Sequence, residues 1–223
     1  MTARPNKRPR APEPVPDDPF EPLRSPQWLS EARRKAIHLS FIVLPLELLL
    51  RFLPWPRTHR EFRLLFVALT AGAIALDVLR IHERRVRTFF RQFFGEMIRE
   101  HERMSLLGST YLLLAALIAV EVFPQPLAAA AIGFTVVGDA MGALVGKAWG
   151  RHKMLNKSYE GALGCLVACL AWAAVVAAVA HVPWGILIAG AFAATIVEML
   201  PIPLDDNLGI TLAAGYTMKL LAG

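Results

Sequence analysis

The sequence holds little cysteine and has no apolar segment near its start. Cys165 and Cys169 are the two cysteines among 223 residues. They lie four positions apart without a His or carboxylate partner at metal-ligand spacing, which argues against a metal site. We expect both thiols to be buried core groups. Residues 1–35 lack the apolar core of a cleavable secretory signal, so the first membrane helix is expected to serve as the insertion signal.

Charged residues are also sparse, and the apolar residues come in long runs. The chain is 55% hydrophobic and 19% charged, with a mean hydropathy of +0.44. Runs of about 18 to 20 mostly apolar residues can cross a bilayer as helices. The pattern predicts an all-α, polytopic membrane helical bundle of about seven transmembrane helices, not a soluble domain. The predicted spans are residues 36–53, 62–79, 106–123, 127–146, 161–181, 184–200 and 207–222.

Basic residues are distributed unevenly around these spans. The net charge of +6 could suggest a nucleic-acid binder, but the positions of Lys and Arg matter more than their sum. With a cytoplasmic N-terminus, nearly all of them fall on the cytoplasmic side, as the positive-inside rule requires. We therefore expect a protein of the bacterial inner membrane with no nucleic-acid partner. The basic residues on the other side are Arg51, Arg57, Arg60, Arg63 and Lys219.

Two segments differ from the predicted spans. Residues 1–30 are rich in Pro and Arg, which predicts a disordered cytoplasmic tail and leaves residues 31–223 as one membrane-embedded domain. Residues 86–98 place apolar side chains opposite arginines at helical spacing, which predicts an amphipathic helix in the membrane interface. We expect this helix to act as a lipid-facing anchor. Its apolar side chains are Val86, Phe89, Phe90, Phe93, Met97 and Ile98.

Polar motifs interrupt the apolar runs on one side only. "EARRKAIH" (31–38) precedes the first span, and "GST" (108–110) opens the third. "GDA" to "KSYEG" (138–161) joins the fourth span to the fifth, and "EMLPIPLDDN" (198–207) joins the last two. Charges at membrane depth are costly unless they are paired or functional. We therefore expect the four segments to converge in one cytoplasmic polar pocket.

The first motif places one carboxylate, two cations and an imidazole on a single helical face. These are Glu31, Arg34, Lys35 and His38, at spacings of three, four and seven. Cations in this arrangement can hold a phosphate. The alternative, left open by the sequence, is flanking charge that keeps the helix from sliding into lipid.

Asp139 lies among small residues near the cytoplasmic end of a predicted span. A carboxylate in such a place is either neutralised or paired, and a divalent cation would keep it ionised. We predict a metal ligand, with a structural ion pair to Lys147 as the alternative. The glycines at every fourth position from Gly138 to Gly150 favour close packing between helices.

A cluster of basic residues follows Asp139. The segment "GALVGK" is not a P-loop, because Met141 and Ala148 stand where that motif needs Gly and Ser or Thr. A polyphosphate-sized patch of donors remains, close to a helix start at Gly161 that offers free N–H groups. Positive-inside charge is the alternative, but it does not account for Asp139, Ser158 or Glu160. The patch consists of Lys147, Arg151, Lys153, Lys157 and Ser158.

The motif "LDDN" places three oxygen-bearing side chains at the start of the last span. They are Asp205, Asp206 and Asn207, and Glu198 precedes the first of them by seven residues. Magnesium favours a few carboxylates together with phosphate oxygens, so the cluster indicates a magnesium site. Helix capping is the alternative, although it needs only one such residue.

In kind, order and spacing, these four motifs resemble the family of dolichol kinases, phytol kinases and CTP-dependent diacylglycerol kinases. The resemblance covers about residues 30–215. It implies that residues 31–223 transfer the γ-phosphoryl group of CTP to the hydroxyl of a membrane lipid, which could be a polyprenol, a phytol-like alcohol or a diacylglycerol. It also implies Mg²⁺ as cofactor and CTP, lipid and the bilayer as partners. Assembly into a homo-oligomer stays open.

The resemblance further implies roles for the polar residues. Asp139 and Asp206 would bind metal, with Glu160 and Asp205 as further ligands. Asp139, Asp206 or His38 would take the proton of the lipid hydroxyl. The triphosphate would be held by Lys147, Lys157 and Ser158 together with Arg151 and Lys153, and the acceptor side would be bordered by Arg34, Lys35, Asn207 and Glu198.

Two other functions compete with the kinase interpretation. Phosphatidate cytidylyltransferases share the pattern from Asp139 to Gly161 and would transfer CMP to a lipid phosphate. They carry a His-Gly-Gly run followed by Asp-Arg where this chain has "PLDDNLGI", so the kinase is favoured. A non-enzymatic transporter is the second alternative, and the one-sided polar cluster and the lack of an inverted repeat argue against it.

Overall fold

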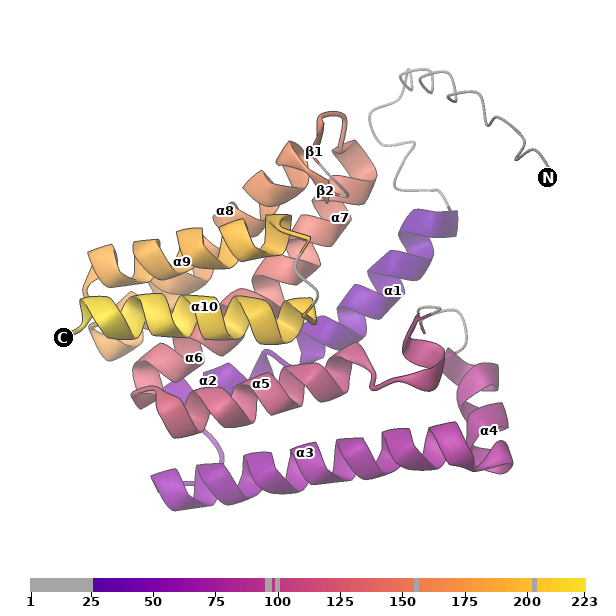
Figure 1. Ribbon diagram of the computed structural model, residues 1–223. Helices are drawn as coiled ribbons and strands as arrows, with labels where there is room; N and C mark the ends of the chain where they lie inside the picture. The colour runs from indigo at the N-terminus through magenta and orange to yellow at the C-terminus, as the bar shows by residue number, and fades with distance from the viewer. Residues whose placement is uncertain (1–25, 95–97, 99–100, 155–156, 202–203) are drawn as a thin grey trace, which may run out of the picture.

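The computed structural model describes residues 26–94, 98, 101–154, 157–201 and 204–223, and this part of the chain is almost entirely helical (Figure 1). One short hairpin, formed by β1 and β2 in antiparallel register, interrupts the helices. The elements are α1 (Pro26–Ser40), α2 (Val43–Leu50), α3 (His59–His82), α4 (Arg84–Phe94), η2 (His101–Met104), α5 (Gly108–Val122), α6 (Gln125–Gly133), η3 (Phe134–Gly138), α7 (Asp139–Trp149), β1 (Lys153–Met154), β2 (Lys157–Ser158), α8 (Tyr159–Ala180), α9 (Trp184–Met199) and α10 (Asp206–Leu221).

Within the described residues, three helical rods are long and apolar enough to cross a membrane. They are α3, the continuous rod α6–η3–α7 over Gln125–Trp149, and α8. Shorter apolar helices, α5 and α9, lie beside them. The structure is nearly all helical, as predicted, and its long apolar helices indicate a membrane protein. The predicted count of seven spans is not confirmed. One predicted span, residues 36–53, consists of two helices separated by a turn at residues 41–42.

The break between α1 and α2 has a local cause. Pro45 has no backbone N–H, so the carbonyl of Phe41 cannot receive its regular helical hydrogen bond from that residue. The carbonyl accepts instead from the N–H of Leu44 at 3.0 Å, a tighter turn. The N-terminal boundary also differs from the expectation, because residues 26–30 belong to α1 and not to a tail. Pro26 is preorganised for a first helical position. Residues 1–25 lie outside the described part.

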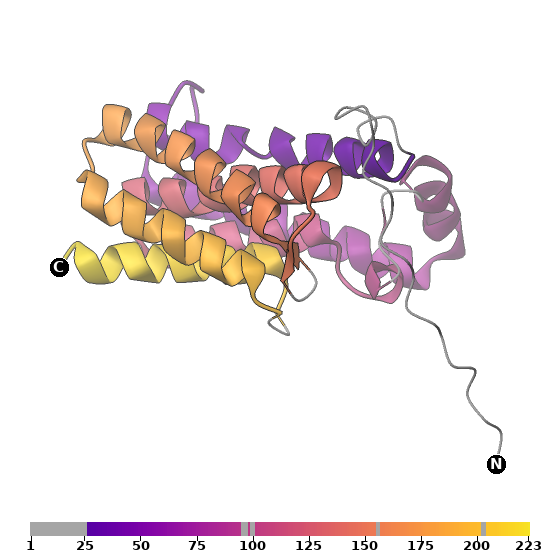
Figure 2. The ribbon, with the colours of Figure 1, turned by 90° about the horizontal axis from the view of Figure 1, so that it is seen from above.

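The centre of the bundle is α6. Every residue from Leu127 to Gly133 is buried, because α2, α5, α8 and α10 surround this helix. In contrast, α3 lies at the edge of the bundle and packs against α5 (Figure 1), and its Phe62 and Phe66 are buried. Most of its other apolar side chains, such as Leu64 and Val78, are exposed and would face lipid. Figure 2 shows α9 and α10 side by side along the bundle, in agreement with their close packing.

Small residues hold α7 against α8. A Cβ atom built on Gly142 would lie 3.3 Å from the Cβ of Cys165, and one on Gly161 would lie 2.8 Å from the carbonyl oxygen of Gly142. The glycine spacing therefore serves close helix packing, as the sequence predicts. Cys165 and Cys169 are fully buried, which confirms their assignment to the core.

The predicted interfacial helix is present as α4. All four of its phenylalanines lie on one side, and neighbouring rings contact one another with centroids 4.7–6.2 Å apart. None of its residues is buried. The structure ends this helix at Phe94, and Met97 of the predicted face lies outside the described residues.

Candidate functional site

At one end of the bundle α1 approaches α7, and α5, α8 and α10 begin there (Figure 1). Polar side chains from these helices gather at this end. The expected convergence of four separate segments is therefore observed. Two cavities open there, of about 220 Å³ and about 330 Å³. We call the smaller the charged cavity and the larger the aromatic cavity, after the residues that line them.

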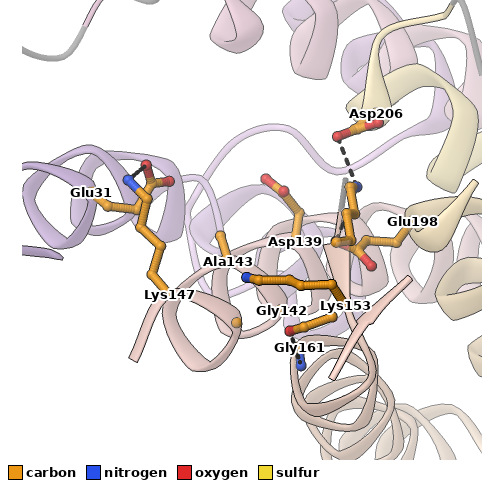
Figure 3. Close-up of a pocket in the computed structure, with 12 residues that line it drawn as sticks. Glu31, Asp139, Gly142, Ala143, Lys147, Lys153, Gly161, Glu198 and Asp206 are labelled. Atoms are coloured by element: carbon orange, nitrogen blue, oxygen red, sulfur yellow. Dashed lines mark hydrogen bonds and ion pairs between the residues drawn. The ribbon is translucent and has the colours of Figure 1, made fainter. Parts of the chain in front are cut away.

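The charged cavity is lined by α1, α7, α9, α10, the hairpin and the first turn of α8. Figure 3 shows Asp139 near its middle, with Glu31 and Lys147 towards one side and Glu198 and Asp206 towards the other. Three lysines and four carboxylates thus surround a space of about 220 Å³. The lining residues are Glu31, Asp139, Gly142, Ala143, Gly146, Lys147, Lys153, Lys157, Ser158, Gly161, Glu198 and Asp206.

Lys157 joins two carboxylates across this cavity. Its Nζ lies 3.0 Å from Glu198 Oε1 and 3.2 Å from Asp206 Oδ2, so β2 is tied to both α9 and α10. Burial alone would lower the pKa of Lys157, but the two carboxylates outweigh it and raise the pKa above its usual 10.5. Lys157 therefore stays charged throughout the physiological range.

A second ion pair spans the opposite side of the cavity. Lys147 Nζ lies 3.0 Å from Glu31 Oε2, which connects α7 to α1, and Arg34 also pairs with Glu31. Burial would raise the pKa of Glu31, but Arg34 and Lys147 outweigh it and hold the pKa below its usual 4.5. The Glu31 carboxylate is therefore ionised at neutral pH and occupies cations that an anionic ligand could otherwise use.

Asp139 forms its ion pair with Lys35 of α1, not with Lys147. Lys35 is 1% exposed and Asp139 is 8% exposed, so the pair is buried. His38 Nε2 lies 3.6 Å from the same Asp139 oxygen and 3.5 Å from the carbonyl oxygen of Thr135. The predicted alternative partner was wrong because α1 lies against this part of α7 and brings two nitrogen-bearing side chains to it.

A π-helical turn, η3, immediately precedes Asp139. Such turns are rare and are often found at functional sites. Thr135 within it shares a hydroxyl hydrogen bond of 2.6 Å with Thr211, and the Thr211 hydroxyl donates to the carbonyl of Asn207 at 2.8 Å. These hydrogen bonds connect the turn before Asp139 to the first turns of α10, which begins with Asp206.

The aromatic cavity lies on the other side of the same two aspartates. Its walls come from α1, α3, α4, α5 and α10, and Phe41, Phe90 and Phe94 supply most of its aromatic surface. Among the described residues, Asp139 and Asp206 line both cavities. The remaining lining residues are Arg34, Ile37, His38, Leu76, Ile98, Glu102, Leu107, Gly108, Ser109, Asp205 and Asn207.

Some predicted site residues lie elsewhere or have a structural partner. Glu160 and Arg151 line neither cavity, and the Glu160 carboxylate contacts His152 Nδ1 at 2.7 Å. Asp205 caps α10 by accepting the Asn207 N–H at 3.0 Å, so the capping alternative is observed for this residue. Ser158 lines the charged cavity and also caps α8, since its Oγ accepts the Gly161 N–H at 3.1 Å.

The sequence interpretation missed a buried network at the C-terminal end of α3. Asp77 pairs with Arg80 at 3.0 Å and accepts hydrogen bonds from the Leu107 N–H and the Thr110 hydroxyl. An Asp and an Arg three positions apart at the end of an apolar run were the available signal. Glu102, also missed, accepts the Gly108 N–H at 3.1 Å and lines the aromatic cavity.

A magnesium ion needs oxygen ligands, and the charged cavity offers two suitable carboxylates. The described residues contain no group of three His, Cys, Asp or Glu side chains in metal-binding arrangement. Glu198 Oε2, however, is buried without a hydrogen-bond partner. Asp206 lines the same cavity, and Lys157 pairs with both carboxylates. Magnesium that arrives with a polyphosphate commonly uses only one or two carboxylates, so this pair fits such an ion.

Comparison with known proteins gives the following matches. Residues 28–201 match the profile of the Cytidylyltransferase family. An uncharacterized protein of Rickettsia prowazekii (strain Madrid E) is 29% identical over 143 residues, which are 63% of this chain and 67% of that protein. The CTP-dependent diacylglycerol kinase 1 of Schizosaccharomyces pombe (strain 972 / ATCC 24843) is 27% identical over 161 residues, 65% of this chain and 74% of that kinase. No solved structure matches the chain.

Proposed function

Because the chain belongs to the cytidylyltransferase family, we propose that it is a membrane enzyme that transfers the γ-phosphoryl group of CTP to the hydroxyl of a membrane lipid. The observation that carries this proposal is the shared wall between the two cavities. Asp139 and Asp206 face a lysine-rich space on one side and an aromatic space on the other. A polar and an apolar substrate can therefore meet at the same two carboxylates.

The charged cavity suits a nucleoside triphosphate. Lys147, Lys153 and Lys157 converge there, and the first turn of α8 lies beside the cavity at Gly161, so the positive end of its helix dipole favours an anion. Lys147 and Lys157 are paired with carboxylates in the structure, and phosphate oxygens would compete for them. Bound magnesium would neutralise charge on the phosphates, with Glu198 and Asp206 as its protein ligands.

The aromatic cavity suits the acceptor. An alkyl chain would lie along Phe41, Phe90 and Phe94, with its hydroxyl directed towards the shared aspartates. Of the three candidate bases, we favour Asp206, which would bind magnesium through one carboxylate oxygen and accept the proton through the other. Asp139 is held by a buried lysine, whereas Lys157 would turn from Asp206 to the phosphates when CTP binds. Phosphoryl transfer depends mainly on positioning and charge neutralisation, which this arrangement provides.

Charge in the aromatic cavity favours the kinase over the cytidylyltransferase reaction. Its ionisable lining comprises four carboxylates against one arginine and one histidine. A lipid phosphate would meet repulsion there, whereas a neutral hydroxyl would not. The cytidylyltransferase reaction remains the alternative because the family as a whole carries that name.

Isotope labelling separates these reactions. Purified protein in lipid vesicles would receive Mg²⁺ and CTP labelled at either the γ- or the α-phosphate, with polyprenol, phytol, diacylglycerol or phosphatidate as acceptor. We expect the γ label in the lipid and its loss in Asp206→Asn, with Arg151→Gln as a matched control that lies outside both cavities. Label from the α position would establish the cytidylyltransferase reaction. Label from neither position would refute transfer and leave the transporter interpretation.

The orientation follows from charge. We propose that both cavities open to the cytoplasm, in a bacterial inner membrane, because most basic residues lie at that end. Nucleotide would enter from the aqueous side, and lipid would enter laterally from the cytoplasmic leaflet.

A further inference from the structure

The helix α4 has two faces with different neighbours. Phe90 and Phe94 line the aromatic cavity, so part of its apolar face forms a wall of that space. The other two phenylalanines, Phe89 and Phe93, are exposed and stack with centroids 4.7 Å apart. An exposed aromatic pair beside a largely apolar cavity is suited to the acyl region just below the headgroups.

The opposite face of α4 is polar, and all its charged residues are basic. Arg84, Arg85, Arg87 and Arg91 are all exposed, and the helix contains no acidic residue. Arg87 has a structural role, since it donates hydrogen bonds to the carbonyls of Arg80 and Ile81 at the end of α3. For Arg84, Arg85 and Arg91, the described part of the chain supplies no ion-pair partner, although three like charges within eight residues repel one another.

Three observations therefore define the occupant of this face. The arginines require anions, the exposed phenylalanines require a hydrocarbon phase, and both lie on one helix at the height of the polar end of the bundle. A soluble anion would satisfy the arginines but not the phenylalanines. Phospholipids with a net negative headgroup satisfy both because they place phosphate above acyl chains.

We propose that Arg84, Arg85 and Arg91 form a binding site for anionic phospholipid headgroups. Lipid bound there holds α4 in the leaflet, so that Phe90 and Phe94 keep the aromatic cavity in contact with the acyl region from which the acceptor comes. The site itself does not depend on the proposed function. Its effect on acceptor binding rests on the proposed identity of the aromatic cavity.

The site is tested by lipid retention in native mass spectrometry. Full-length protein would be released from micelles that contain equal amounts of phosphatidylglycerol and phosphatidylcholine. Each basic residue near an anionic surface contributes roughly fivefold to partitioning, so we expect at least tenfold preference for phosphatidylglycerol. R84Q/R85Q/R91Q should lose this preference, whereas R84K/R85K/R91K and R60Q, an exposed arginine outside α4, should keep it. If the glutamine variant kept its preference for phosphatidylglycerol, the proposed headgroup site would be refuted.

The coupling to the cavity has its own measurement. In phosphatidylcholine vesicles with increasing phosphatidylglycerol, KM for the lipid acceptor should fall severalfold while KM for CTP stays constant. The glutamine variant should not respond, and its unfolding temperature should match that of the wild type. An active enzyme whose acceptor KM ignores phosphatidylglycerol would overturn the coupling. A protein without transfer activity would refute the proposed function, and lipid retention would still decide the site.

Discussion

Lys35 and Asp139 form a buried ion pair whose energetic coupling can be measured without an activity assay. Removing one partner of such a pair leaves an uncompensated charge in a poorly solvated place, which costs about 3–5 kcal/mol. Lys35→Met and Asp139→Asn should each have this effect. For a chain of this length, a destabilisation of 1 kcal/mol lowers Tm by roughly 2–4 °C, so each variant should unfold about 6–20 °C below the wild type.

The double variant K35M/D139N gives the sharper result. Replacing both partners with neutral groups leaves no unpaired charge buried. The double variant should therefore lose much less stability than the two single variants lose together. Unfolding would be followed in detergent at pH 8, where an ordinary histidine is neutral and His38 does not substitute for Lys35 as a cation. Wild-type stability in K35M, or strict additivity in the double variant, would refute the buried pair.

Other substitutions test the remaining parts of the site. Arg34 and Lys147 lower the pKa of Glu31, so its ion pairs should stabilise the protein above pH 4.5 and lose that effect as the pH falls through the depressed pKa. The Tm difference between the wild type and Glu31→Gln, measured from pH 7 to pH 3, should therefore disappear at the acidic end. Gly161→Ala should lower Tm because the added Cβ would lie 2.8 Å from the Gly142 carbonyl oxygen. Gly72→Ala, at a helical position with open space around it, should raise Tm slightly. Equal effects of the two substitutions on Tm would contradict the tight α7–α8 contact. Lys157→Met should weaken Mg²⁺–CTP binding at least tenfold in titration calorimetry, while Arg151→Met should leave it nearly unchanged; similar losses in both would indicate nonspecific attraction.

The sequence was sufficient for the class of fold and for the convergence of the four polar segments, because membrane-length apolar runs and one-sided charge leave few arrangements. It could not identify the partner of Asp139. Lys147 lies eight residues away and Lys35 lies 104 residues away, and only the packing of α1 against α7 decides between them. Glu160 was misplaced for a related reason. It sits in the same short motif as Ser158, but the hairpin turns its carboxylate towards His152 and out of the cavity lining.

The division into two cavities was also beyond the sequence. Motif order indicated one polar pocket, and nothing in the spacing of Asp139 and Asp206 indicates that each would line two spaces. The interfacial helix shows the same limit. Helical periodicity predicted its amphipathic faces, but the participation of Phe90 and Phe94 in a cavity wall depends on where α3 ends and how the chain returns to α5.

The π-helical turn at Phe134–Gly138 sets the rotational phase of the rod that carries Asp139. Each residue of an α-helix advances by about 100°, so deletion of one residue here would swing the carboxylate by roughly a quarter turn while leaving composition and hydropathy almost unchanged. The direction of this side chain is thus encoded in the number of residues before it, in addition to their identities. A survey of single substitutions would pass over such information, whereas insertions and deletions along the rod would reveal it.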